Sequence, residues 1–195
     1  MDILFAAAAL AVFGLPMLLI GLAIRLTSPG PAIFRQRRVG HSGEPFEMLK
    51  FRSMRADIDP YGDSPHGGDD PRLTRLGRIL RETSLDELPQ LINVLRGEMS
   101  LVGPRPLYER QAQQWNDRQQ RRLLVKPGLT GYAQVYGRAS LTHEEKIELD
   151  LYYVDNRGPL MDLRLLAGTL GRLVLPGGVY ERRYSRDQVR EGHRG

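Results

Sequence analysis

The pattern of apolar and polar positions separates an apolar amino-terminal segment from a longer amphipathic remainder. Residues 3–24 carry no charged side chain, and about 20 such residues suffice for a helix to cross the hydrocarbon core of a bilayer. Asp2 stands where a signal peptide would have its basic region, and no small-residue cleavage site follows before Arg25. We therefore expect residues 1–27 to form a retained membrane anchor.

The course of this anchor depends on Pro16, which follows Gly14 and Leu15. Proline removes one helical hydrogen bond and crowds the carbonyl group four residues earlier. We expect the anchor to be broken near Pro16, as a bent spanning helix or as a re-entrant helix that returns to the side it entered. By the positive-inside rule the arginines that follow place the rest of the protein in the cytoplasm, where they would also meet anionic lipid headgroups. These arginines are Arg25, Arg35, Arg37 and Arg38.

The remaining pattern predicts an α/β chain that is mostly helical, with a catalytic domain at residues 28–178 and a basic tail at residues 179–195. Residues 56–71 are rich in Asp, Gly and Pro and predict a loop. The predicted strands are 32–39, 46–52 and 132–136, of which the first two form a hairpin. The predicted helices are 72–81, 107–125, 141–153 and 162–174.

Two of these helices carry further signals. Thr142 followed by Glu145 has the spacing of a capping box, in which each side chain bonds the backbone of the other residue. The helix at 162–174 has one leucine stripe, which is typical either of a core helix or of an amphipathic helix lying on a membrane surface. The stripe consists of Leu163, Leu166, Leu170 and Leu173.

A further amphipathic segment, residues 84–96, begins with two adjacent carboxylates, Asp86 and Glu87. Ser84 and Glu87 have capping-box spacing, and Gly97 suits a left-handed helix stop. An acid in a first helical turn is favoured by unpaired N–H groups and stays ionised, which suits a nucleophile or a metal ligand. Capping alone would explain the same residues. The apolar stripe consists of Leu85, Leu88, Leu91, Ile92 and Leu95.

The composition of the chain excludes some kinds of site and favours an anionic binding partner, but it does not identify that partner. The 195-residue chain has no cysteine, which excludes disulfides and thiolate metal sites. Its net charge of +5 points to an anionic partner: nucleic acid, a phosphorylated substrate or an acidic membrane surface.

Arginines on rigid turns favour the phosphorylated substrate. Arg105 lies between Pro104 and Pro106, and a guanidinium group matches phosphate oxygens in a bidentate way. Mg²⁺ prefers one or two carboxylates completed by substrate phosphates, so the acid pair predicts chemistry on a phosphorylated substrate at a membrane. The alternative is a non-catalytic basic membrane adaptor or anion-binding protein.

Eight short motifs, in order, resemble the bacterial sugar transferases, the monotopic phosphoglycosyl transferases. They run from the anchor to the helix ending near residue 174. The motifs are SPGP at 28–31, FRQRRVG at 34–40, KFRSM at 50–54, DPRLTRLG at 70–77, TSLDELPQL at 83–91, SLVGPRPL at 100–107, KPGLTG at 126–131 and QVYGR at 134–138.

This resemblance implies transfer of a sugar phosphate from a UDP-sugar to undecaprenyl phosphate, with release of UMP and a requirement for Mg²⁺. Asp86 matches the family's nucleophile, which forms a covalent phosphosugar-aspartyl intermediate, and Glu87 matches its metal ligand. The resemblance further implies a re-entrant anchor in the bacterial inner membrane and a catalytic domain that faces the cytoplasm. The cations that match its anion- and nucleotide-binding positions are Lys50, Arg52, Arg81, Arg105 and Arg138.

Two points differ from the family or stay open. The family's anchor breaks at Ser-Pro, whereas this chain reads Leu15-Pro16. The short form of the chain resembles family members that use modified diamino sugars. Self-association is possible. Nucleic acid is not expected as a partner.

Overall fold

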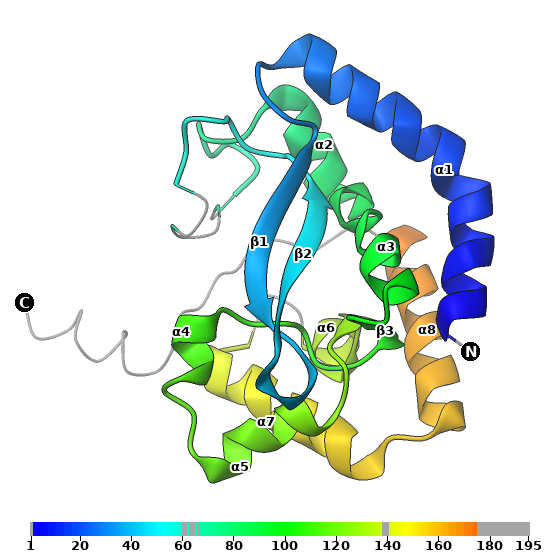
Figure 1. Ribbon diagram of the computed structural model, residues 1–195, viewed down its shortest axis with the longest axis vertical. Helices are drawn as coiled ribbons and strands as arrows, with labels where there is room; N and C mark the ends of the chain where they lie inside the picture. Colours follow the sequence, from blue (N-terminus) through cyan, green and yellow to red (C-terminus); the bar gives the residue numbers. More distant parts are fainter. Residues whose placement is uncertain (1, 60–61, 63–64, 66, 138–140, 175–195) are drawn as a thin grey trace, which may run out of the picture.

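The computed structural model describes residues 2–59, 62, 65, 67–137 and 141–174, with side chains described to residue 171. The chain is mostly helical, with two small two-stranded sheets, as the sequence predicts (Figure 1). The predicted basic tail, residues 179–195, lies outside the described residues. In chain order the elements are α1 (Asp2–Thr27), β1 (Ile33–Val39), η1 (His41–Gly43), β2 (Pro45–Phe51), α2 (Arg75–Glu82), η2 (Leu85–Glu87), α3 (Gln90–Leu95), β3 (Ser100–Val102), α4 (Glu109–Ala112), α5 (Asp117–Gln120), η3 (Arg121–Leu124), β4 (Gly128–Thr130), α6 (Tyr132–Tyr136), α7 (His143–Asn156) and α8 (Pro159–Val174).

The predicted anchor is the single helix α1, which is long and apolar enough to cross a membrane. It continues through Pro16 as one helix, so the helix is not interrupted there. Figure 1 shows that α1 bends partway along its length, as one of the two expected forms does. A bend accommodates the hydrogen bond that proline removes while the residues on either side stay helical.

One stripe of α1 packs against the rest of the protein along its length. Ala6 is fully buried against α3, and Ile24, near the other end, packs beside Phe51 of β2. The Ser100 hydroxyl donates a hydrogen bond to the Asp2 carboxylate at 2.9 Å. Both ends of the helix therefore contact the same domain.

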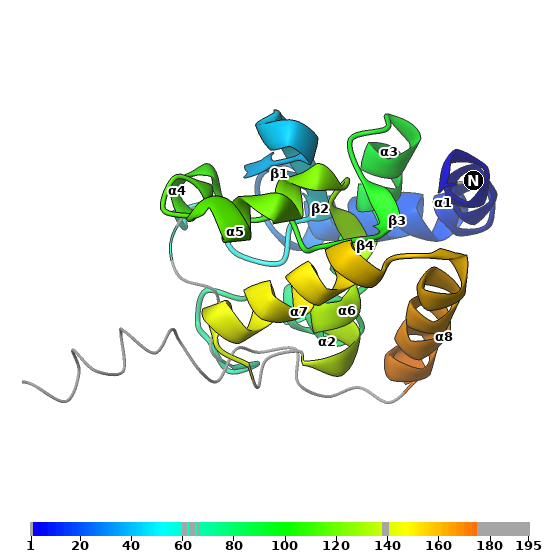
Figure 2. The ribbon, with the colours of Figure 1, turned by 90° about the horizontal axis from the view of Figure 1, so that it is seen from below.

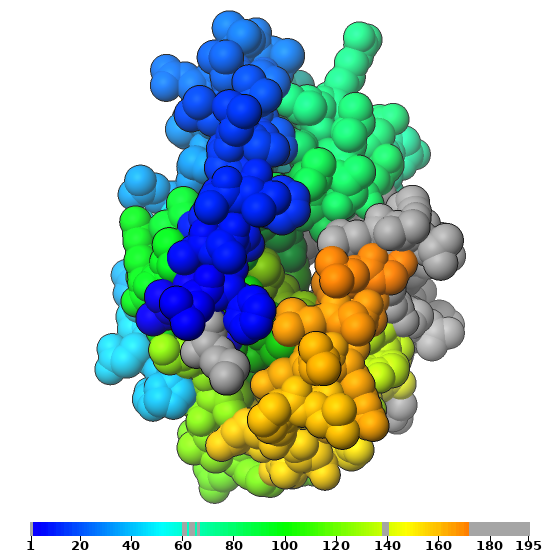
Figure 3. Space-filling model, turned by 90° about the vertical axis from the view of Figure 1, so that its right-hand side faces the viewer, coloured from blue at the N-terminus to red at the C-terminus, as the bar shows by residue number. Residues whose placement is uncertain are grey.

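The opposite side of α1 is apolar and exposed, and α8 continues this surface. Figure 3 shows the two helices side by side on one face, and Figure 2 shows them together at the same edge of the molecule. Contiguous exposed apolar surface of this kind marks a membrane or protein contact. The exposed apolar side chains are Ile3, Leu4, Phe5, Val12, Phe13, Leu15, Leu18, Leu19, Leu22 and Leu26 of α1 and Leu160, Leu163 and Leu170 of α8.

The leucine stripe predicted for α8 does not act as one face. Leu163 and Leu170 are exposed, whereas Leu166 packs against a core cluster around the buried Leu165. One side of α8 therefore packs in the core, whereas the other side is exposed and apolar.

The predicted hairpin is confirmed as β1 and β2, which pair antiparallel with Phe34 opposite Lys50. The second sheet pairs β3 with β4 in parallel, Ser100 lying opposite Gly128. This pairing continues through a glycine: the N–H of Gly103 donates to the carbonyl of Thr130 at 2.9 Å. A side chain on Gly103 would lie 2.4 Å from the Lys126 carbonyl oxygen, so only glycine allows this close approach.

Two predicted elements are wrong. Residues 132–136 form the helix α6 instead of a strand, with Val135 packed in the cluster around Leu165. Residues 107–125 form three short helical pieces, α4, α5 and η3, instead of one helix. Five residues are too few for periodicity to separate helix from strand, and the capping box of Asn116 starts a new helix inside the longer segment.

Candidate active site

The two predicted site acids lie on a short connection between α2 and α3. Helix α2 ends at Glu82, and Ser84 follows with φ +58°, in the left-handed region that reverses the chain direction. Asp86 and Glu87 then occupy the single turn η2, and regular helix resumes only at Gln90, directly after Pro89. Proline has no N–H to donate, so a helix starting at Ser84 would lose a hydrogen bond at this position.

The predicted capping box between Ser84 and Glu87 is therefore wrong. Ser84 adopts left-handed backbone angles and its side chain makes no capping hydrogen bond. The capping box that was predicted from Thr142 and Glu145 does form, because those residues begin a regular helix, α7. Gly97 has φ +76°, which confirms the predicted left-handed stop after α3.

Without a bond to Ser84, the Glu87 side chain turns towards two cations. One oxygen of its carboxylate, Oε1, accepts from Lys50 Nζ at 2.8 Å and from Arg105 Nη2 at 2.9 Å. Burial alone would raise the pKa of Glu87, but the charges and hydrogen bonds of Arg105 and Lys50 outweigh it and hold the pKa well below its usual range. Glu87 is therefore ionised throughout the neutral range.

Asp86 behaves differently although it is the next residue. It is 5% exposed. Burial raises its pKa to about 6, against the attraction of Lys50 and with a contribution from the neighbouring Glu87 charge. The sequence predicts stabilisation of this charge by a helical first turn, but the structure gives a single short turn and a buried side chain instead. Asp86 is still largely ionised at pH 7, as a carboxylate of raised basicity.

Asn93 brings Lys50 to the acid pair by holding β2 against α3. Its Oδ1 accepts from the N–H of Leu49 at 3.0 Å, and its Nδ2 donates to the carbonyl of Glu47 at 2.7 Å. The Asn93 side chain is fully buried. Lys50, next to Leu49, then reaches η2 with its side chain only 14% exposed, and burial lowers the pKa of its amine while Glu87 opposes that shift.

Of the remaining predicted cations, Arg81 lies with the cluster and Arg52 does not. The charge of Arg81 lowers the pKa of Asp86, which places the two side chains near each other, and its buried Nη1 has no hydrogen-bond partner in the part of the chain that the structure describes. Arg52 is buried elsewhere and donates to the carbonyls of Ser28 and Pro29. Arg138 lies outside the described residues.

The sequence reasoning missed Arg38, which it grouped with the lipid-facing arginines. Arg35 and Arg37 are exposed and pair with acids of neighbouring segments, as surface cations of a strand do. Arg38 lies on the other side of β1, stacks on the ring of Tyr108 at 3.6 Å, and donates to the Pro106 carbonyl. Burial lowers its pKa to about 10, with Tyr108 opposing the shift. The alternation of side chains along a strand separates Arg38 from the other two and was the available signal.

These contacts together form a carboxylate pair among cations. Within the described residues no group of three or more His, Asp or Glu side chains could hold a metal ion. A Mg²⁺ ion that needs only one or two protein carboxylates and completes its shell with substrate phosphates still fits Glu87. The arrangement as a whole suits an acid nucleophile and a bound polyanion, since Asp86 is buried beside cations that include Lys50 and Arg81.

Comparison with known proteins points to one family. A family model described as "Bacterial sugar transferase" matches residues 1–175. The sugar transferase EpsL of Bacillus subtilis is 44% identical over 158 residues, which cover 81% of this chain and 77% of that protein. A UDP-glucose:undecaprenyl-phosphate glucose-1-phosphate transferase of Caulobacter vibrioides is 43% identical, with 92% of this chain and 70% of that protein covered.

The name of a third relative specifies a different sugar. The UDP-N-acetylgalactosamine-undecaprenyl-phosphate N-acetylgalactosaminephosphotransferase of Aeromonas hydrophila is 40% identical, with 91% of this chain and 43% of that protein covered. The similarity therefore extends over nearly the whole chain and over relatives named for different sugars.

Proposed function

The chain belongs to the bacterial sugar transferase family, and we propose that it transfers a sugar phosphate from a UDP-sugar to undecaprenyl phosphate and releases UMP. The named reactions of the Caulobacter and Aeromonas relatives support this reaction class. Because those relatives are named for glucose and N-acetylgalactosamine, the proposal is limited to a UDP-sugar as a class. The product would begin the assembly of a glycan on its lipid carrier.

One observation carries the proposal: a buried carboxylate, Asp86, stands beside a second acid that two cations already hold. Because Glu87 is paired with Lys50 and Arg105, it is not the group that attacks. Asp86 has the raised basicity that favours a nucleophile, and the unpartnered Nη1 of Arg81 is a donor suited to a phosphate oxygen.

The reaction proceeds through two displacements at the same phosphorus atom. In the first, an Asp86 carboxylate oxygen attacks the sugar-linked phosphorus, the anhydride bond to the UMP phosphate breaks, and UMP leaves with the bonding electrons. In the second, a phosphate oxygen of undecaprenyl phosphate attacks that phosphorus and the bond to Asp86 breaks, which restores the carboxylate. Neither step needs a proton from the protein. The intermediate is a phosphosugar-aspartyl acyl phosphate, in which the Asp86 carboxylate and the sugar phosphate form a mixed anhydride.

Mg²⁺ is proposed as the metal, with Glu87 as its protein ligand. When bound, the ion would neutralise charge on the phosphates and make the phosphorus a better electrophile. The low pKa of Glu87 keeps it in the form that binds a cation. The ion and the two basic side chains on Oε1 would then share one carboxylate, so we expect metal affinity to increase when Lys50 is replaced by Met.

The membrane arrangement proposed here is a re-entrant anchor in the bacterial inner membrane, with the domain in the cytoplasm. Contact of both ends of α1 with one domain supports an anchor that does not carry its amino end across the bilayer. The exposed apolar surface of α1 and α8 would enter the lipid, and the basic side chains nearby, such as Arg25, would meet anionic headgroups. Asp86 would then lie where the phosphate of a lipid acceptor can reach it.

The decisive experiment measures UMP release and covalent labelling together. The purified protein with Mg²⁺, undecaprenyl phosphate and a panel of UDP-sugars is expected to release UMP with at least one sugar, and Asp86→Asn is expected to release none. Intact mass after incubation with the UDP-sugar alone should increase by one sugar phosphate. Asp155→Asn, which changes a carboxylate that is 44% exposed, is the matched control and should keep full activity.

The same experiment separates the alternative. A non-catalytic membrane adaptor or anion-binding protein would release no UMP and gain no mass with any UDP-sugar. Full activity of Asp86→Asn would instead retain the enzyme and refute the nucleophile.

Topology has its own test because the chain has no native cysteine. A single cysteine at Asp2, the charged residue in the first turn of α1, should be labelled by an impermeant maleimide only after the cytoplasmic side is opened. Gln114→Cys, in the exposed part of the domain, is the control for that side. Labelling of the residue-2 cysteine in intact spheroplasts would refute the re-entrant arrangement.

A further inference from the structure

The turn that carries Arg105 is held at four consecutive carbonyl groups. The carbonyl of Pro104 accepts from the N–H of Gly128, and that of Leu107 accepts from the N–H of Val39. Between them, the two remaining carbonyls accept from guanidinium groups instead of backbone. Arg122 Nη2 donates to the carbonyl of Arg105 at 3.0 Å, and Arg38 Nη1 donates to that of Pro106 at 3.3 Å.

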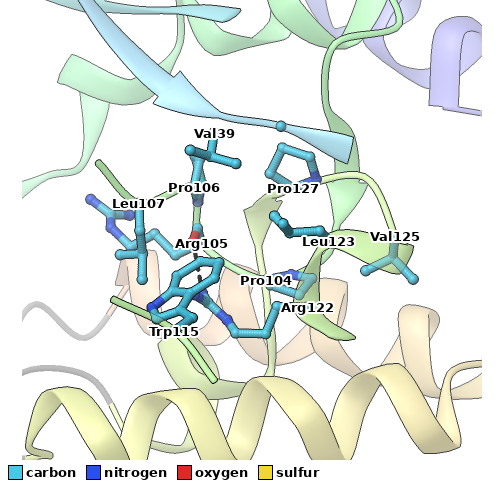
Figure 4. A pocket seen from close by; sticks show the side chains of 11 residues that line it. Val39, Pro104, Arg105, Pro106, Leu107, Trp115, Arg122, Leu123, Val125 and Pro127 are labelled. Carbon is cyan, nitrogen blue, oxygen red and sulfur yellow. Dashed lines mark hydrogen bonds between the residues drawn. The ribbon is translucent and has the colours of Figure 1, made fainter. Parts of the chain in front are cut away.

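The contact from Arg122 is the buried one. Arg122 is 4% exposed and its Nη2 also lies 2.6 Å from Oδ2 of Asp150, which is 2% exposed. Its guanidinium lies 4.9 Å from the Trp115 ring, and the dashed line in Figure 4 marks its bond to the Arg105 carbonyl. Asp150 belongs to α7 and Arg122 to η3, so the pair connects this part of the fold to the turn.

Stability alone does not account for such a pair. Removing two charges from water is costly, and apolar residues of similar volume are often at least as stabilising. This pair is also incompletely satisfied: among the described residues, Arg122 Nε and Asp150 Oδ1 are buried without a hydrogen-bond partner. What a guanidinium group supplies here and an apolar side chain cannot is a donor to the Arg105 carbonyl.

That carbonyl determines where the Arg105 side chain points. Proline at position 104 fixes its own φ, and proline at position 106 restricts the residue before it to extended backbone angles. The backbone rotation that sets the orientation of the Arg105 carbonyl is ψ of that residue. A donor fixed at this oxygen therefore fixes the direction of a side chain that is 45% exposed and bonds Glu87.

We propose that Arg122, itself held by Asp150, is a positioning residue for Arg105. It acts through the Arg105 backbone and does not touch substrate. The inference rests on the proposed function, and it takes Arg105, one of the cations expected at the anion- and nucleotide-binding positions, as a ligand of a phosphate of the UDP-sugar. It adds a second group of residues, remote from the acid pair, on which that binding depends.

The test is a double-mutant cycle on kcat/KM for UMP release, using Arg122→Lys and Arg105→Ala. Lysine keeps a positive charge near Asp150, but its Nζ ends one bond short of the position of Arg122 Nη2, the single nitrogen that donates to both acceptors. It therefore cannot hold both acceptors in the same geometry. Each single variant is expected to lower kcat/KM, Arg122→Lys by about tenfold or more, as a misplaced binding group does. The double variant should equal Arg105→Ala alone, because Arg122 has nothing left to position.

The matched control comes from the adjacent residue. Arg121, on the same η3, pairs with Asp155 of the same α7, but both side chains are more than 40% exposed. Arg121→Lys should leave kcat/KM unchanged in both backgrounds. If Arg122→Lys is not recovered folded, Asp150→Asn tests the same series of contacts, since it keeps an acceptor of the same shape, and should show the same lack of additivity.

The outcomes separate the inference from the function on which it rests. Multiplicative losses in the double variant would overturn the positioning role, because Arg122 would then act independently of Arg105. If Arg105→Ala kept full activity, the phosphate-binding role of Arg105 would fail and the positioning role with it. Loss of activity in Arg105→Ala with no loss in Arg122→Lys would overturn the inference alone.

Discussion

The raised pKa of Asp86 predicts that the candidate active site lowers the stability of the folded protein. The carboxylate titrates at about 6 in the folded protein, whereas the same side chain outside a folded environment titrates near 3.8. Above pH 6 the folded protein must carry a buried charge that the unfolded chain carries in water. Replacement of Asp86 by Asn removes that charge and keeps the shape of the side chain.

The size of the effect follows from the two pKa values. Their separation is about 2 pKa units, and each unit corresponds to about 1.4 kcal/mol, so Asp86→Asn should stabilise the protein by up to about 3 kcal/mol at pH 7.5. For a protein of this length that corresponds to roughly 5–10 °C in Tm. Because the folded pKa is the higher one, the penalty is absent below about pH 4, grows between pH 4 and pH 6, and is fully present above about pH 6.

The adjacent acid serves as the internal control because its pKa is shifted in the opposite direction. Glu87→Gln removes a charge that Lys50 and Arg105 stabilise, and it leaves Lys50 buried without its ionic partner. It should therefore destabilise the protein at pH 7.5, on the order of 3 kcal/mol, and this loss should begin to shrink only as the pH falls below 4.5, the ordinary pKa of glutamate.

The assay is thermal unfolding of wild type, Asp86→Asn and Glu87→Gln in one detergent or bicelle system at pH 7.5 and at pH 4.5. The Asp86→Asn variant is expected to have the highest Tm at pH 7.5 and to approach wild type at pH 4.5. An Asp86→Asn variant with a Tm equal to or below that of wild type at pH 7.5 would refute the reasoning, because the buried charge would then not be a net cost.

Three further outcomes are expected. The kcat/KM for UMP release should rise with pH and level off, with a midpoint near 6, as Asp86 ionises; a flat profile between pH 5 and pH 7.5 would contradict this. Asn93→Ala should lower the free energy of unfolding by about 2–4 kcal/mol, measured by chemical denaturation, since it leaves the N–H of Leu49 buried without its acceptor; a change below about 0.5 kcal/mol would show that the bond to β2 is dispensable. Gly103→Ala should prevent correct pairing of β3 with β4, because the new methyl group would lie 2.4 Å from the Lys126 carbonyl oxygen, and limited proteolysis should show an unprotected domain; wild-type protection would contradict the close approach.

The sequence predicts the parts of this fold that local chemistry determines. The hairpin, the capping box at Thr142 and the left-handed glycine at position 97 all depend on residues within a few positions of one another. The acid pair was also identified, and two of the five predicted cations, Lys50 and Arg105, contact it directly. Arg81 lies nearby, with the charge that lowers the pKa of Asp86.

Contacts between distant segments determine what the sequence did not predict. Arg52 is predicted from the sequence to bind an anion, but the turn at Ser28 comes to lie beside it and accepts hydrogen bonds from its Nη1 and Nη2. Arg122 gave no signal, because its partner Asp150 is 28 residues away on another helix. The ionisation of Asp86 depends on burial, a property of the assembled fold that residue spacing does not carry.

The contact of Asp2 with Ser100 has a consequence for how the protein is made. The two residues are separated by 98 positions in the chain, and a ribosome adding about 5–20 residues per second needs roughly 5–20 s to span them. In the proposed membrane arrangement, the apolar helix therefore leaves the ribosome and meets the bilayer well before the segments that bury Ala6 and contact its amino end have been made. During that interval lipid alone must shield the helix. Closure of the domain onto the anchor is then a late event at the membrane surface, and a chain halted before Ser100 would retain an inserted helix that lacks this partner.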